Sequence, residues 1–356
     1  MKKDQTTPQT VIGIDLGDKK HAVCVMNQAG KILRETSIPN NAASLKRLGG
    51  EFPAALAVIE VGTHSPWISR LLKDCGLTVL VANARKVKAI YANTRKSDRL
   101  DAVILARLGR LDPELLHPIE HNSEQAQRDL LPVKMRDTLV RQRTASITSL
   151  RGSMKSLGMR LPSCSSASFP KQARAMLGAE GRHDLLPIAE PILLSIECLS
   201  KQIVAYDKII EETAAERYPA AARLREIPGV GPITSLSFVL MIENADRFSD
   251  SRDVGAWLGL VPRRDQSGDS DKQMPISKAG NRYLRRLLVQ SAQYILGHFG
   301  PDCDLKRYGH RIAARGGKAA KKRAIIAMAR KLSVLMLALW KQEGTYEPFR
   351  GGLPVA

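Results

Sequence analysis

The feature that most constrains the fold is a series of short apolar segments in the first third of the chain, separated by Gly, Pro and Asn. The first three, TVIGIDLG, HAVCVMN and KILRETSIP, follow one another with only short polar connections. Such spacing is typical of an antiparallel meander of strands. Two later runs, at 54–60 and 77–84, are continuously apolar, which predicts strands of a parallel sheet covered on both faces.

Helical signals separate the later strands. The segment NNAASLKRLGGEF opens with capping asparagines and is predicted to stop at Gly49 and Gly50, and SPWISRLLKDCG follows the next strand. A third helix is predicted after Ser97, a suitable N-cap residue. The order is therefore β-β-β-α-β-α-β-α, which predicts a ribonuclease H-like, or RuvC-like, domain over residues 11–120.

The net charge indicates the kind of partner. Lys and Arg number 55 against 35 Asp and Glu, which gives a formal net charge of +20. A surplus of this size favours nucleic acid over a small neutral substrate, although a basic protein with no nucleic-acid role is the alternative. The N-terminus lacks the apolar stretch of a secretory signal, and no apolar run is long enough to cross a membrane. Five scattered cysteines fit a reducing cytosol, and we expect a cytoplasmic, nucleoid-associated protein.

The middle of the chain carries two apolar series at heptad spacing. They predict a helical hairpin or a coiled coil. Packing within the chain and formation of a dimer-forming coil are both open. The two series are Val140, Ile147, Leu150, Met154 and Leu157, and then Ile196, Leu199, Ile203, Tyr206 and Ile210.

The last third of the chain is predicted to be mainly helical. LREIPGVGPITS predicts a tight turn between two helices, similar to a helix-hairpin-helix, whose Gly229 and Gly231 let backbone N–H groups approach a phosphate. An ordinary interhelical turn is the alternative. The predicted fold class is therefore α/β plus α. Its predicted parts are a tail (1–10), the RuvC-like domain (11–120), a helical or coiled-coil segment (121–220), a C-terminal domain (221–345) and a tail (346–356).

Four acidic residues of the first domain are candidates for chemistry. Asp15 and Glu60 end two strands that are neighbours in the predicted topology, and Asp98 and Asp101 share one face of the third helix. Four converging carboxylates repel one another unless a cation lies between them. Mg²⁺, or Mn²⁺, binds such oxygen ligands together with phosphate oxygens, and two ions can stabilise a phosphoryl transfer. These residues are therefore predicted to be metal ligands and catalytic, with the number of ions left open.

A purely structural explanation exists for one half of this set. Asp98 and Asp101 lie in the basic stretch KSDRLDAVILARL. At the start of a helix their negative charges stabilise the helix through its dipole, and arginines lie nearby in the sequence. On that alternative they pair with Arg95 and Arg99 and hold no metal.

Basic residues of the last third form the candidate nucleic-acid surface. Several lie in loops or at the start of helices, where they can reach a phosphate backbone, but a solvated charged face is the alternative. Ser267, in RRDQSGDS, follows two arginines that can hold a phosphate, and Ser270 and Ser277 compete with it for any role as a nucleophile. The predicted nucleic-acid-binding residues are Gly229, Gly231, Arg263, Arg264, Lys278, Arg282, Arg285, Lys321 and Lys322.

Taken together, several motifs resemble one family. IDLG, AVIEVGTHSPW and KSDRLDA, followed by LREIPGVGPITS, AWLGLVPRRDQSGDS and ISKAGNRYLRRLL, are similar to the DEDD/serine insertion-sequence transposases of the family numbered one hundred and ten. The resemblance runs from about residue 11 to 345. It implies that Asp15, Glu60, Asp98 and Asp101 form the acidic tetrad and that Ser267 is the nucleophile.

The resemblance also implies a function and partners. Members of this family are recombinases that excise and insert their own mobile element, guided by a bridge RNA that pairs with donor and target DNA. It implies a phosphoserine link to DNA, a metal at the RuvC-like site, and dimers that pair into tetramers. A working site would then combine the tetrad of one chain with the serine of another.

Three other functions compete with this interpretation. IDLG also resembles the first phosphate loop of sugar-kinase and chaperone-type ATPases, but the sequence has no second phosphate motif or adenosine-binding glycine stretch. A RuvC-like junction nuclease would keep the metal site and use water in place of Ser267. A non-catalytic nucleic-acid binder would leave the four acidic residues without a role.

Overall fold

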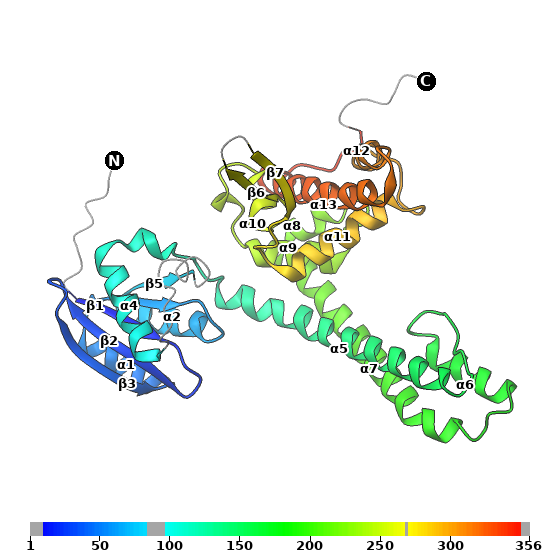
Figure 1. Ribbon diagram of the computed structural model, residues 1–356, viewed down its shortest axis with the longest axis horizontal. Coiled ribbons are helices and arrows are strands. Elements are labelled where there is room, and N and C mark those ends of the chain that lie inside the picture. Colours follow the sequence, from blue (N-terminus) through cyan, green and yellow to red (C-terminus); the bar gives the residue numbers. More distant parts are fainter. Residues whose placement is uncertain (1–9, 84–96, 268–269, 350–356) are drawn as a thin grey trace. The chain divides into compact units, whose positions relative to one another are not determined.

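The computed structural model describes residues 10–83, 97–267 and 270–349 (Figure 1). The chain divides into two compact units, residues 1–124 and 125–356. The predicted domain boundaries at 120, 220 and 345 stay predictions, because the division into units places a boundary only near the first of them.

The first unit is built on a mixed five-stranded sheet. Its strand order is β3-β2-β1-β4-β5. β2 runs antiparallel to both β1 and β3, whereas β1 pairs with β4, and β4 with β5, in parallel. The predicted meander and the two later strands are therefore confirmed. The strands are β1 (Thr10–Asp15), β2 (Lys20–Asn27), β3 (Ile32–Pro39), β4 (Leu56–Glu60) and β5 (Thr78–Ala82).

Helices cover both faces of this sheet (Figure 1). Ile12 and Ile14 of β1 belong to the core that contains the apolar side chains of α1 (Ala42–Glu51) and α2 (Ser65–Asp74). Val11, from the opposite face of the same strand, packs with α4 (Asp98–Leu111). Alternate side chains of a strand point to opposite faces, so the two cores explain why the strands read as continuously apolar.

The predicted stop of the first helix at Gly49 and Gly50 is wrong. α1 continues through both glycines and ends at Glu51. A Cβ atom on Gly49 would lie 2.7 Å from the Cβ of Cys75, so glycine is required here for close packing and not to end a helix.

The end of the first unit is tied to the sheet and to α2. Ile119, after the short helix η1 (Pro113–Leu116), forms a bridge with Val81 of β5. The Ser65 hydroxyl and His121 Nε2 form a hydrogen bond of 2.9 Å. Burial lowers the pKa of His121, and the neighbouring cations Arg70 and Lys73 lower it further. This segment is therefore held by a neutral imidazole.

The second unit begins with an antiparallel helical hairpin, as predicted. Its long helices α5 (Glu124–Lys155) and α7 (Leu186–Arg217) lie side by side, with α6 (Phe169–Ala179) between them in sequence (Figure 1). Arg136 donates to Asp207 at 2.5 Å, and Arg143 to Ser200 at 3.1 Å.

Much of the predicted heptad series is buried inside the hairpin. Ile147, Leu150 and Met154 pack with Ile196 and with side chains of α6. Ile203 and Ile210 are also buried, whereas Leu157 is exposed. Internal packing therefore accounts for the main stripe of α7, whereas Ile188 and Ile192, four residues apart on the same helix, form an exposed stripe.

The open end of the hairpin shares one core with the C-terminal helices. Leu130 and Val133 of α5 and Ile210 of α7 belong to the same apolar cluster as the C-terminal helices. The buried carboxylate of Asp129 accepts hydrogen bonds of 2.7 Å from both Arg217 and Tyr218. Burial and this bond raise the pKa of Tyr218 to about 12.

The remaining elements form a helical bundle with one hairpin of strands. Phe238 and Trp340 meet edge to face in its core, with ring centroids 6.4 Å apart. The elements are α8 (Pro219–Leu224), α9 (Pro232–Ile242), η2 (Ala245–Arg247), α10 (Asp253–Trp257), β6 (Pro262–Ser267), β7 (Ser270–Ile276), α11 (Arg282–Leu296), α12 (Asp304–Ala313) and α13 (Gly317–Gln342).

Two further expectations concern the whole chain. Among the residues that the structure describes, no helix is long and apolar enough to span a bilayer. All five cysteines lie in the described ranges and are free, as their scattered positions predicted.

Candidate functional site

The carboxyl ends of two neighbouring strands bring Asp15 and Glu60 to one edge of the sheet. β1 and β4 pair in parallel, with Ile14 opposite Ile59. Asp15 ends β1 and Glu60 ends β4, so each follows one member of this residue pair. Both are half-buried.

Helix α4 supplies the other two predicted acids. Ser97 is its N-cap, as predicted, and the Ser97 hydroxyl accepts a hydrogen bond from the Leu100 N–H at 3.3 Å. Asp98 and Asp101 lie in the first turn, where the helix dipole stabilises negative charge.

Contacts at its two ends fix the direction of α4. Near its start, the Ala102 carbonyl oxygen would lie 2.0 Å from a Cβ atom on Gly13, so only glycine allows this approach. At its end, Arg110 donates to the Gln28 carbonyl at 3.3 Å, next to the residue of β2 that pairs with Thr10. α4 therefore runs antiparallel to β1, and its N-terminus lies at the edge where β1 ends.

All four predicted acids thus belong to one edge of the first unit. Asp98 is exposed, and the other three are half-buried. Within the described ranges, no three His, Cys, Asp or Glu side chains are arranged as ligands of one metal ion. The topology gathers the residues, and their coordination of a metal stays a prediction.

The arginine next to the two aspartates has another partner. Arg99 forms an ion pair with Glu35 of β3. In the part of the chain that the structure describes, no ion pair joins Asp98 or Asp101 to a basic side chain. The structural alternative therefore fails for Arg99, and Arg95 lies outside the described residues.

Two histidine pairs near this edge were not predicted as site residues. His64 and Asp18 are 3.3 Å apart, and buried His21 and Asn40 form a hydrogen bond of 3.1 Å. Asn40 also donates to the Asp18 carbonyl at 2.9 Å, which connects the two pairs. Burial lowers the pKa of His21 more than the hydrogen bond with Asn40 raises it, and His64 lowers it further. The partners in each pair are distant in sequence and are brought together by the pairing of strands, so the spacing of histidines in the sequence could not reveal them. The one local sign of a site residue is the position of His64, four residues after Glu60.

The predicted nucleophile lies on the strand hairpin of the second unit. Ser267 is the last residue of β6 and pairs with Ser270 of β7. The Ser267 side chain and residues 268–269 lie outside the described residues, so the serine's role stays a prediction. Pro275 lies at an irregularity in the β6–β7 pairing, a position that suits a residue without an N–H.

Most predicted phosphate-binding side chains of this region are exposed. Arg263 and Arg264 are consecutive residues of β6, so they point to opposite faces of the hairpin. Arg282 is the first residue of α11, behind the N-cap Asn281. Lys278 has a backbone φ of +54°, which is uncommon for a residue with a side chain.

Arg285 is placed differently from the other predicted phosphate ligands. Its guanidinium donates to the Leu258 carbonyl at 2.8 Å and to the Gly280 carbonyl at 3.2 Å. These bonds give Arg285 a clear role in holding the loop before α11, and its binding to nucleic acid stays a prediction.

The IPGVG turn joins α8 to α9 as expected. Gly229 has a φ of +78°, and a Cβ atom there would lie 3.0 Å from the Ser291 carbonyl oxygen. Gly231 is the N-cap of α9, and Pro232 occupies the first helical position. A helix start has N–H groups without partners inside the helix, which suits a phosphate.

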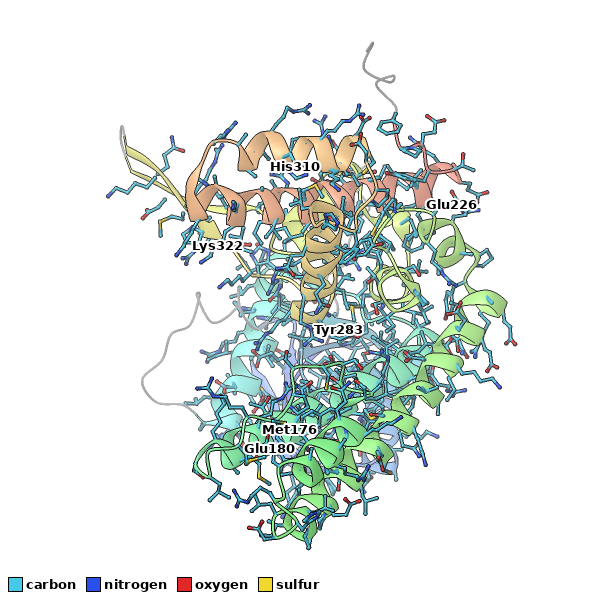
Figure 2. The ribbon with its side chains drawn as sticks, turned by 90° about the vertical axis from the view of Figure 1, so that its right-hand side faces the viewer. Met176, Glu180, Glu226, Tyr283, His310 and Lys322 are labelled. Carbon is cyan, nitrogen blue, oxygen red and sulfur yellow. The ribbon has the colours of Figure 1, made fainter. Side chains whose placement is uncertain are left out.

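Lys321 and Lys322 lie in the first turns of α13 and are exposed. Figure 2 shows Lys322 on the side of the β6–β7 hairpin. Lys322 also lines a basic cavity at the base of that hairpin.

Two family models match the chain in the two units. A model of DEDD transposases of the IS110 type, described as "Transposase", matches residues 12–159. A second, described as "Transposase IS116/IS110/IS902 family", matches residues 221–309. The first range contains all four predicted acids, and the second contains Ser267 and the IPGVG turn.

Curated relatives agree with the family models. The transposase for insertion sequence element IS1111A of Coxiella burnetii is 27% identical over 94% of this chain and 91% of its own length. The transposase for IS1328 of Yersinia enterocolitica is 26% identical over 80% of this chain and 83% of its own. The pilin gene-inverting protein of Moraxella lacunata is 30% identical, over 36% of this chain and 38% of its own. With both family models matched in order, the chain belongs to the IS116/IS110/IS902 family of transposases, which are DNA-processing enzymes.

Proposed function

We propose that this transposase is a recombinase that excises and inserts an insertion sequence, using a metal-dependent acidic site and Ser267 as nucleophile, under the guidance of a structured RNA. The observation that carries this proposal is the gathering of Asp15, Glu60, Asp98 and Asp101 at one sheet edge. Four acidic residues placed at one edge of a domain, in a chain of net charge +20, are otherwise difficult to explain.

The first unit supports a ribonuclease H-like, RuvC-like fold. Its order β3-β2-β1-β4-β5, with β2 antiparallel to its neighbours, is the arrangement expected of that fold. The acidic edge then corresponds to the carboxyl ends of the parallel strands, where open α/β sheets bind ligands.

The donor set suits Mg²⁺ or Mn²⁺. The four carboxylates supply the oxygen ligands that these ions prefer. A bound ion there would offset negative charge on the scissile phosphate. Asp98 is exposed, so its side chain is free to turn toward the other carboxylates.

The serine step exchanges one phosphate ester for another. The Ser267 hydroxyl oxygen attacks phosphorus and its proton passes to a base, while the bond from phosphorus to one deoxyribose oxygen breaks and that oxygen takes up a proton. The product is a phosphoserine ester and a free hydroxyl on the cut strand. Because a phosphodiester is kept, a hydroxyl of another strand can reverse the step and join the DNA.

Nucleic acid is bound by the cations of the second unit in this proposal. Arg263, Arg264, Arg282, Lys321 and Lys322 are exposed and can contact phosphates without loss of fold. The partners are donor DNA, target DNA and a bridge RNA.

A second copy of the chain completes the site in this proposal. Helix α7 has exposed apolar side chains four residues apart on one face, with Ile188 at 69% and Ile192 at 40% exposure. Such residues on a helical hairpin favour association. Dimers that pair into tetramers would allow the acidic edge of one chain to work with Ser267 of another.

A junction nuclease is the competing function, and the acidic edge supports it equally. In that case water replaces Ser267 as the nucleophile, and no protein–DNA link forms. The test is Ser267→Ala on end-labelled DNA, with covalent adducts resolved in denaturing gels. We expect loss of strand exchange and of the adduct by about a thousandfold or more.

Ser270→Ala and Ser277→Ala are the matched controls for this test. Both serines belong to the same segment, and Ser277 donates its backbone N–H, which alanine keeps, to Val261. Normal cutting by Ser267→Ala, with no adduct in the unmodified protein, would establish the nuclease. Sequencing of RNA that co-purifies with the protein checks the guide, and random fragments would contradict guidance.

A further inference from the structure

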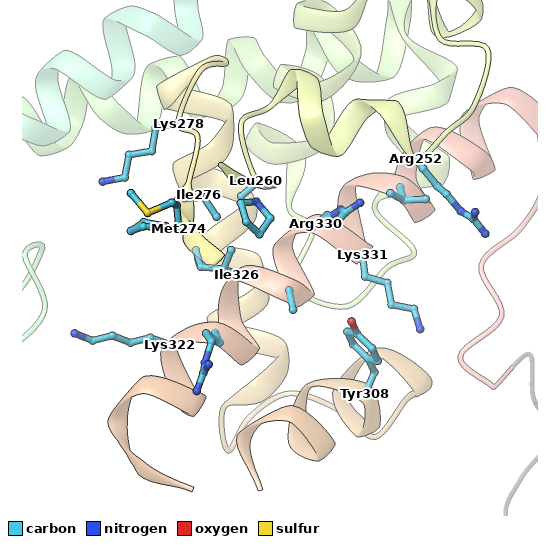
Figure 3. Close-up of a pocket in the computed structure, with 15 residues that line it drawn as sticks. Arg252, Leu260, Met274, Ile276, Lys278, Tyr308, Lys322, Ile326, Arg330 and Lys331 are labelled. Carbon is cyan, nitrogen blue, oxygen red and sulfur yellow. The ribbon is translucent and has the colours of Figure 1, made fainter. Parts of the chain in front are cut away.

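A large basic cavity lies at the base of the β6–β7 hairpin, between that hairpin and α13 (Figure 3). Its volume is about 1230 Å³. Its floor is apolar and includes Leu260, Ile276, Ile326 and Val334. The cavity exceeds the roughly 300–1,000 Å³ of most small-molecule sites, so it has room for more than one nucleotide.

Six cations surround this apolar floor. They are Arg252, Lys278, Lys322, Arg323, Arg330 and Lys331, and no acidic residue lines the cavity in the part of the chain that the structure describes. Within that part, none of the six forms an ion pair. Concentrated positive charge without internal compensation attracts an anionic occupant.

The cavity also contains one aromatic ring. Tyr308 of α12 lines the wall, and the Lys331 ammonium lies 4.4 Å from the centre of its ring. Figure 3 shows the two side chains next to each other. The lysine is thus held in place by a cation–π contact and stays available to a phosphate.

Close backbone contacts shape the wall that carries Lys278. A Cβ atom on Gly280 would lie 1.9 Å from the Trp257 carbonyl oxygen. The Lys278 N–H donates to the Gly259 carbonyl at 3.1 Å, and the Ser277 N–H donates to Val261 at 2.8 Å. The Lys278 backbone is therefore held in its uncommon conformation by the fold itself.

The combination of floor and rim selects the occupant. A duplex keeps its bases stacked inside, so its phosphates would meet the cations and the apolar floor would stay empty. A single strand presents both charged phosphates and flat bases, and grooves that bind single strands combine cations with apolar or aromatic platforms. An unpaired strand is therefore the polyanion that this cavity fits.

The position of the cavity indicates which strand. Pro262, at the base of β6, lines the cavity, and Ser267 ends the same strand. The two residues are five steps apart along the strand, or about 17 Å, which is about five steps of stacked DNA. We propose that the cavity binds an unpaired stretch of the DNA strand that Ser267 cuts, with bases on the apolar floor and phosphates on the cationic rim. The identity of that strand rests on the proposed function.

The test measures binding and needs no cleavage. Fluorescence anisotropy of the full chain with Ser267→Ala is recorded on three DNA probes, which are a short single strand, the same strand without bases and a blunt duplex of equal length, and on single-stranded RNA of the same sequence. Ala327 lines the cavity on α13, and Ala327→Trp fills the floor. Ala319→Trp is the matched control, because Ala319 is exposed on the same helix and does not line the cavity.

Ala327→Trp is expected to weaken binding of the single strand about tenfold, since base contacts are lost, and to leave the abasic strand and the duplex unchanged. The double variant Lys322→Gln, Arg323→Gln is expected to weaken binding of the single strand and binding of the abasic strand by equal factors. It should also reduce the slope of log affinity against log salt by about 1.4. Ala319→Trp should change nothing.

Three results would overturn the proposal. Unchanged single-strand binding by a folded Ala327→Trp protein would exclude base contacts in the cavity. Equal losses of affinity for the single strand and the duplex in Ala327→Trp would indicate a surface that contacts only the DNA backbone. A loss confined to single-stranded RNA of the same sequence would assign the cavity to RNA. Each result concerns this cavity alone, because the serine adduct assay decides the proposed function separately.

Discussion

Arg99 of α4 pairs with Glu35 of β3, although it lies between Asp98 and Asp101 in the sequence. The ion pair directs the only arginine of that first turn away from the two aspartates. The positive charge of Arg99 is thus compensated within the first unit, and no arginine among the described residues forms an ion pair with Asp98 or Asp101. Two predictions concern this edge.

Replacing a carboxylate at the edge should remove cleavage and spare DNA binding. Asp15→Asn and Asp101→Asn keep the size of the side chain and remove its charge, so we expect Mg²⁺-dependent cleavage to fall by about a hundredfold or more. Asp74→Asn is the control, since Asp74 is exposed at the end of α2. Cleavage rates and affinity for an uncut DNA are the measurements. Unchanged rates in both variants would reject the metal assignment.

Close packing of α4 on β1 should be indispensable for the same edge. Gly13→Ala places a methyl group against the Ala102 carbonyl, and we expect a loss of at least about 3 kcal/mol in the free energy of unfolding. Gly50→Ala is the control, because Gly50 lies inside α1 with open space beside it. This variant should gain about 0.5–1 kcal/mol in the free energy of unfolding. Chemical denaturation measures both. Equal stabilities for the two variants would contradict the placement of α4.

The half-buried His121, which follows η1, should make the first unit less stable in acid. The pKa of His121 is lowered from its ordinary 6.5, so the unfolded chain takes up a proton at a higher pH than the folded chain. The free energy of unfolding should therefore be unaffected well above pH 6.5 and fall as the pH decreases below it.

The comparison for this prediction is His121→Gln, which keeps a polar partner for Ser65 and cannot titrate. Denaturation curves between about pH 5 and pH 8 should show a weaker pH dependence for this variant. His117→Asn, at an exposed residue, should retain the full dependence, and His21 supplies a background in every variant. An identical pH dependence in His121→Gln would exclude the His121 imidazole as its cause.

The exposed stripe of α7 should mediate association. Ile188 and Ile192 lie four residues apart and are 69% and 40% exposed. Replacing both by Glu is expected to shift the protein to monomers in sedimentation velocity at micromolar concentration. Val204→Glu, on the same helix but off the stripe, is the control. If the double variant keeps the assembly state of the unmodified protein, association uses another surface.

The strand order could be predicted because each strand of the first unit carries its own signal. The apolar runs around Ile12 and Val58 and the turns between strands are local features, and they gave the order of elements correctly. The same holds for Ser97, whose capping role depends on its neighbours alone.

Other features depend on contacts between distant segments. Gly49 reads as a helix stop, but Cys75, from another element, makes it a packing residue. The pairing of His21 with Asn40 follows from the register of β2 with β3. Arg285 resembles its basic neighbours in sequence, and only the path of the preceding loop gives it two carbonyl partners.

Asp129 has a consequence for anyone who wishes to dissect this protein. Its carboxylate bonds to Arg217 and Tyr218, so the first turns of α5 hold the last turn of α7 in place. A fragment starting at residue 221 would lose these hydrogen bonds, and it would also lose Val133 and Ile210 from the shared core. Truncations meant to isolate the serine hairpin should therefore retain residues 125–133 and 210–218 together, for example by joining the two stumps with a short artificial loop.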